Sequence, residues 1–114
     1  MKPRNAADAA AKVEVTYAGD AETYTLAPPE QFTVAASLAF KWYDEIEAGR
    51  KRIEHRDATP YWMDRFFRGD DKTPAAFVKF TRGYTSTNMT WTVARIDIDA
   101  DNRQLHIHLG RRVA

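Results

Sequence analysis

The chain contains no cysteine among its 114 residues. Without a thiol it forms no disulfide, offers no thiolate nucleophile and builds no zinc–thiolate site, and this composition is compatible with a reducing compartment. The sequence also lacks a hydrophobic run approaching the ~18 residues that a membrane-spanning helix needs. Residues 1–4 begin no apolar stretch of signal-peptide length. We therefore expect a cytoplasmic protein without a membrane partner.

Net charge is also nearly absent, because the formal value is only +1. The molecule as a whole therefore guarantees no strong attraction to nucleic acid. The positive charge is concentrated in one stretch instead. Between Gly49 and Arg68 there are six basic residues against three acidic ones, a local excess of three positive charges. A charge run is most often a solvated surface, so binding of an acidic partner has to be argued from particular residues here.

The apolar pattern predicts one α+β domain with a real core, since 44% of the residues are hydrophobic. A loose tail is expected over residues 1–11, followed by an accessory hairpin with strands at 13–17 and 24–26. Residues 1–31 thus precede a main domain at 32–114. Further strands are predicted at 32–40, 52–56, 76–81, 89–98 and 105–109, and helices at 40–48 and 61–67. Closing the strands into a small β-barrel would remove exposed edges, with the two short helices at its mouth or side.

The most informative segment runs from the first helix into the next strand. Gly49 reads as the residue just past the helix C-terminus, because glycine adopts the left-handed conformation without steric cost. From Arg52 onward the side chains should alternate, so that Arg52, Glu54 and Arg56 share one strand face while Ile53 and His55 lie on the other. An acid between two bases on one face of a small domain suggests that this face meets a polar ligand.

These residues carry a family resemblance. Gly49, Lys51, Glu54 and Arg56 form the pattern Gly-x-Lys-x-x-Glu-x-Arg, which resembles the signature of the ASCH domain, a PUA-like β-barrel family. Three further segments resemble that family in the same order, and the similarity covers about residues 32 to 99. They are residues 42–46, residues 60–65 and residues 80–84. The resemblance implies the fold more strongly than the activity, because one fold hosts many functions.

The candidate site gathers around this motif. Lys51, Glu54, Arg56 and Arg65 could line a polar pocket between the strand of Lys51–Arg56 and the helix that begins at Tyr61, or they could form a structural ion-pair network. Trp42 and Trp62 are expected in the core. The proposed ligand-binding residues are Lys51, Glu54, Arg56, Tyr61, Arg65, Arg82 and Tyr84, with Tyr61 and Tyr84 suited to stack on a base.

Several functions follow from the resemblance. The family contains RNA-binding members, so RNA or a modified nucleoside is the expected partner and ligand. A hydrolase branch removes the acetyl group from N4-acetylcytidine with a lysine that activates a threonine. Lys51 matches that lysine, whereas Glu54 stands at the threonine position. An amidohydrolase or a ribonuclease with Lys51 and Glu54 as general acid and base is therefore the alternative, and a non-catalytic interaction module is the third.

The histidines do not assemble an evident metal site. His106 and His108 lie two residues apart on one predicted strand face, but no third ligand is identifiable. We therefore predict no metal and no cofactor. The oligomeric state is left open.

Overall fold

The structure is a computed structural model that describes residues 10–114. Residues 1–9 of the expected N-terminal tail lie outside the described residues. In chain order the elements are β1 (Ala11–Tyr17), β2 (Asp20–Leu26), a 3-10 helix (Pro28–Glu30), β3 (Thr33–Leu38), α1 (Phe40–Glu47), β4 (Ile53–Asp57), α2 (Pro60–Phe66), β5 (Phe67–Arg68), β6 (Thr73–Pro74), β7 (Phe77–Arg82), β8 (Asn88–Asp99) and β9 (Gln104–Arg112). This strand-rich arrangement with two helices confirms the predicted α+β class, although not the predicted barrel.

The predicted N-terminal hairpin is present and extends the main sheet. β1 and β2 are antiparallel, with Tyr17 opposite Asp20. Both residues of the connecting turn have positive φ, 51° at Ala18 and 86° at Gly19, as in the two-residue turns that match strand twist. β1 then pairs in parallel with the second half of β8, from Arg95 to Ile98.

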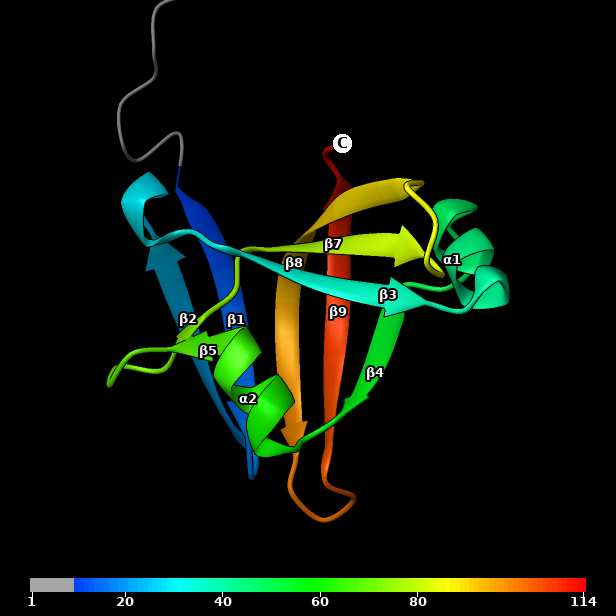
Figure 1. The fold of residues 1–114 in the computed structure, drawn as a ribbon. Helices are drawn as coiled ribbons and strands as arrows, with labels where there is room; N and C mark the ends of the chain where they lie inside the picture. The colour runs from blue at the N-terminus through cyan, green and yellow to red at the C-terminus, as the bar shows by residue number, and fades with distance from the viewer. Residues whose placement is uncertain (1–9) are drawn as a thin grey trace, which may run out of the picture.

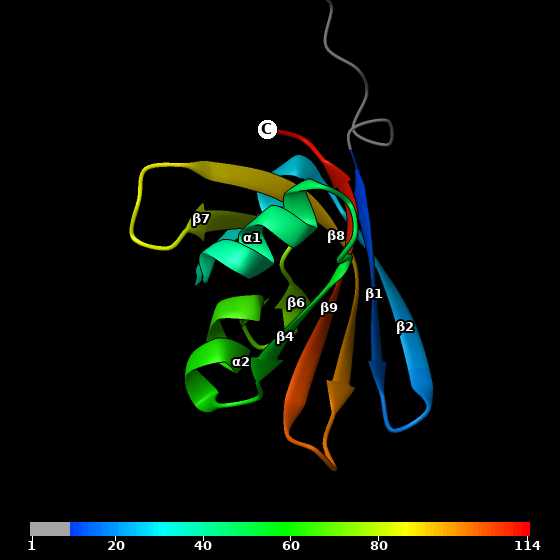
Figure 2. The same cartoon turned by 90° about the vertical axis from the view of Figure 1, so that its right-hand side faces the viewer.

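β8 is the central strand, and its partner changes along its length (Figure 1). β7 pairs with its first half and β1 with its second half on one edge, while β9 follows the other edge. β3 lies outside β7, and β4 lies outside β9. Both helices lie on the same side of β1, β2, β8 and β9 (Figure 2).

The strands do not close into the expected barrel. Among the described residues β3 pairs only with β7 and β4 only with β9, so β3 and β4 do not pair with each other. A closed barrel requires this last pair of strands to be hydrogen-bonded. Only Ala39 separates β3 from α1, so the chain turns into a helix before β3 can run alongside β4. We call the gap between the free edges of β3 and β4 the seam.

The core lies between the sheet and the helices. Tyr43 and Ile46 of α1 and Phe66 of α2 are buried, and the 3-residue spacing on α1 fits one helix face. The prediction for Trp42 was wrong, because its side chain lies outside this face and is 44% exposed. Trp62 is half-buried. No helix among residues 10–114 is long and apolar enough to cross a membrane.

Candidate functional site

The charged motif forms one connected cluster around Glu54. Lys51 Nζ lies 2.9 Å from Glu54 Oε1, and Arg56 donates from Nε to Oε2 at 3.0 Å. The Glu54 side chain is only 7% exposed, whereas those of Lys51 and Arg56 are 22% and 17% exposed. A buried carboxylate is stable only when it is paired and hydrogen-bonded. Glu54 therefore fixes the positions of the two cations.

Local backbone geometry brings these three residues together. Gly49 has φ of 80° and follows the last turn of α1, as predicted. The Lys51 amide donates to the Glu45 carbonyl at 3.1 Å, which turns the chain back across the helix end. β4 then pairs with β9 so that Glu54 lies opposite Ile107. As predicted, alternation places His55 on the opposite face from Glu54, where it contacts His106 instead.

Each cation of the cluster also covers a tryptophan. The Lys51 ammonium lies 4.6 Å from the ring centre of Trp42 on α1, and the Arg56 guanidinium lies 4.7 Å from that of Trp62 on α2. Arg65 lies 5.5 Å from the Trp62 ring and 5.3 Å from the Tyr61 ring. Cations over indole faces attract the ring electrons at these distances. We call this run, from Trp42 through the cluster to Tyr61, the cation–aromatic ladder.

Two members of the ladder also close the seam. Arg56 donates to the Ser37 carbonyl at 2.8 Å, and Arg65 donates to the Ala35 carbonyl at 2.6 Å. These two carbonyls belong to alternate residues of β3 and therefore project from the same edge. Guanidinium groups thus donate to carbonyl oxygens on a strand edge that no other strand of the described residues covers. Arg56 and Arg65 therefore hold β3 to β4 and α2, whatever else they bind.

The two remaining predicted residues lie beside α1. Arg82 at the end of β7 makes a bidentate pair with Asp44, with distances of 2.9 and 3.0 Å. These hydrogen bonds lower the pKa of Asp44 below its usual range. The Arg82 guanidinium also covers the Phe40 ring at 4.1 Å. Tyr84 is fully exposed in the loop between β7 and β8.

Sequence reasoning missed a polar cluster on the opposite sheet face. Asp97 of β8 accepts from Thr16 of β1 at 2.5 Å and lies 2.6 Å from Nε2 of His108 of β9. Burial raises the pKa of Asp97, but these hydrogen bonds outweigh it and leave the pKa below its ordinary value. His106 lies 4.6 Å from the His55 ring. The alternation of His106 and His108 was the available signal, while their partners come from strands far away in sequence.

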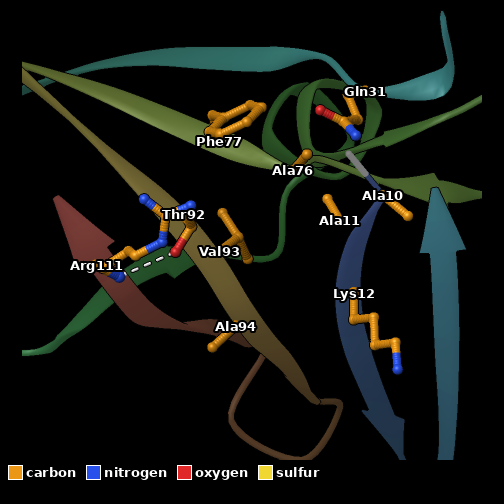
Figure 3. A pocket seen from close by; sticks show the side chains of 10 residues that line it. All are labelled: Ala10, Ala11, Lys12, Gln31, Ala76, Phe77, Thr92, Val93, Ala94 and Arg111. Atoms are coloured by element: carbon orange, nitrogen blue, oxygen red, sulfur yellow. Dashed lines mark hydrogen bonds between the residues drawn. The ribbon is translucent and has the colours of Figure 1, made fainter. Parts of the chain in front are cut away.

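The structure has a cavity away from the ladder. This cavity, of about 430 Å³, opens where β1 and β7 separate along β8, and it is lined by Lys12, Arg111 and several alanines (Figure 3). In that view Lys12 extends along β1, away from Gln31 and Phe77. Of the ladder residues, Arg65 lines a smaller cavity of about 140 Å³ together with Thr33, Val34, Asp64 and Arg68. Between β4 and α2, where the polar pocket was expected, the Arg56 guanidinium packs on the Trp62 ring.

Within residues 10–114 no group of three or more histidine, aspartate or glutamate side chains could hold a metal ion. Comparison with protein-family models, with curated proteins and with solved structures found no match to this chain. The ASCH resemblance therefore remains a prediction from the motif residues.

Proposed function

We propose that this chain is an ASCH-type, PUA-like domain with an open seam, and that it binds RNA or a modified nucleoside on the cation–aromatic ladder. The single observation that carries the proposal is the pairing of cations with exposed rings around one buried carboxylate. Bases can stack on the rings, and the N–H groups of the cations can donate to phosphate or carbonyl oxygens. The ladder offers both on one surface.

The roles of the residues follow from their exposure. Trp42 and Tyr61 are 44% and 61% exposed, so their rings are accessible to a base. Lys51 and Arg56 would contact phosphate or a base carbonyl with the donors that Glu54 leaves unused. Both oxygens of Glu54 already accept from these cations. We therefore propose that Glu54 mainly orients Lys51 and Arg56 toward the ligand.

Titration of short single-stranded RNA and of a nucleoside panel, at two salt concentrations, tests this proposal. RNA affinity should fall steeply between about 50 and 200 mM salt, because phosphate contacts release counterions. Trp42→Ala should weaken binding, and Tyr17→Ala should not, because Tyr17 is 54% exposed but belongs to the hairpin. Folded protein that binds neither class of ligand at the lower salt concentration would refute the proposal.

A hydrolase is the second candidate, and the contact between Lys51 Nζ and Glu54 Oε1 favours it. An ammonium and a carboxylate 2.9 Å apart could serve as general acid and base. Arg56 would hold the negative charge that develops. Incubation with N4-acetylcytidine and with labelled RNA, beside Lys51→Ala and Glu54→Ala, separates this candidate from simple binding. Turnover that survives both substitutions would remove these residues from the catalytic role.

A further inference from the structure

We infer that the ligand of this surface is a single strand of several nucleotides, whose path continues from the ladder across α1 to Tyr84 in the β7–β8 loop. This inference rests on the proposed function and specifies its ligand. It adds Phe40 and Lys41 as contact residues and brings in Tyr84, which the sequence had proposed and which lies outside the ladder. The described residues have six exposed large hydrophobic side chains, and four of them lie along this path: Phe40, Trp42, Tyr61 and Tyr84.

Side-chain packing and an ion pair connect the loop to α1. A Cβ placed on Gly83 would lie 2.5 Å from Cε1 of Phe40, so this ring packs directly against the backbone beside Tyr84. Arg82 covers the same ring and is fixed by its pair with Asp44 of α1. The loop and α1 also lie side by side in both views of the fold (Figures 1 and 2). Tyr84 is therefore held next to the start of α1.

Further contacts connect α1 to the ladder. Phe40 and Trp42 are both exposed on the first turns of α1, at 50% and 44%. Lys41 lies 4.8 Å from the Trp42 ring, and no carboxylate of the described residues pairs with it. Lys51 covers the same ring and leads to Glu54 and Arg56. The path thus alternates rings and cations from the loop to α2.

The chemistry of the path favours a single strand over other acidic partners. Stacking requires bases that are not already paired and stacked in a duplex. An acidic peptide would use the cations but would gain little from four accessible rings. A mononucleoside would reach one or two of those rings. A strand of several nucleotides is the ligand that engages all of them.

Fluorescence anisotropy with an oligouridylate dinucleotide and an octanucleotide tests the path. The octanucleotide should bind at least about tenfold more tightly than the dinucleotide, because each further stacked base adds affinity. Tyr84→Ala should weaken octanucleotide binding by about five- to 150-fold and leave dinucleotide binding unchanged. Tyr17→Ala, which removes an exposed tyrosine on the hairpin, should change neither. Because Tyr84 is fully exposed, its substitution should not affect folding.

The possible failures are distinguishable. Equal affinity for both lengths, or equal effects of Tyr84→Ala and Tyr17→Ala, would overturn the extended path while leaving the proposed function intact. If neither the dinucleotide nor the octanucleotide binds, the proposed function itself is refuted. Full displacement of the octanucleotide by poly-glutamate or by duplex RNA at equal concentration would also overturn the single-strand inference.

Discussion

Glu54 is the residue on which the site depends, because it is the only buried charged side chain among the described residues. Lys51 and Arg56 neutralise it, and β4 holds it against β9. Removing one member of a buried ion pair leaves an uncompensated charge, which costs more than losing a surface pair. Stability and ligand recognition therefore share this residue.

Glu54→Gln should lower the free energy of unfolding by about 1–3 kcal/mol, since two cations lose a charged acceptor. Glu45→Gln is the matched control, because Glu45 pairs with Arg50 on the exposed surface and should change stability little. Urea unfolding followed by circular dichroism measures both. Equal free energies of unfolding for the two variants would show that the buried pairs of Glu54 stabilise the fold no more than an exposed ion pair does.

His55 should make stability depend on pH. Partial desolvation, and then the nearby His106, lower the pKa of His55 below its ordinary value, with Lys51 and His108 acting in the same direction and Glu54 opposing. The folded state therefore binds fewer protons than the unfolded chain just below about pH 6.5. Stability should fall as pH drops from 7 to about 5.

Thermal unfolding at several pH values, with His55→Gln as the comparison, measures this effect. The substitution should flatten the part of the profile between about pH 5 and 7, whereas loss of Asp97 pairing acts lower, below about pH 4. An unchanged slope in the variant would show that His55 is not the responsible group.

Among the secondary-structure elements, α1 and the β7–β8 loop are joined at Gly83. Its φ is 58°, and an added Cβ would meet the Phe40 ring. Gly49 also has positive φ, but an added Cβ there meets nothing within 4 Å. The two glycines therefore separate backbone strain from side-chain packing.

Gly49→Ala should cost about 1–2 kcal/mol from the left-handed conformation alone. Gly83→Ala should cost more, because the Phe40 ring must also move. Denaturant unfolding of both variants decides this. A smaller loss at Gly83 than at Gly49 would contradict the packing of Phe40 on the loop.

Local sequence signals located most elements, and non-local pairing explains what they missed. Gly49 and Pro60 marked the end of α1 and the start of α2, because helix ends depend on neighbouring residues. The open seam could not be predicted, since alternation does not say which strands become neighbours. Trp42 was predicted to lie in the core, but Tyr43 and Ile46 supply the buried face of α1.

The charged motif was predictable for the same local reason. Lys51, Glu54 and Arg56 lie within six residues. Strand alternation places Glu54 and Arg56 on one face of β4, and the turn after α1 brings Lys51 beside them. By contrast, the contacts of Arg56 with Ser37 and of Arg65 with Ala35 join distant segments. Neither contact has a signature in the sequence.

At the scale of the whole molecule, side chains rather than backbone hydrogen bonds bridge the open seam. The same side chains form part of the surface proposed to bind RNA. Arg56 and Arg65 therefore serve both the seam and the ladder. Their substitution would disturb folding and binding together. Exposed ladder residues such as Trp42 test recognition more cleanly.

The most direct test of RNA or nucleoside binding follows the indole N–H signals of the three tryptophans in a ¹⁵N-labelled sample during titration with single-stranded RNA. The signals of Trp42 and Trp62 should shift with the RNA concentration, while that of Trp91, which is only 6% exposed, should stay in place. Shifts confined to Trp91, or no shifts in folded protein at about 50 mM salt, would contradict binding on the cation–aromatic ladder.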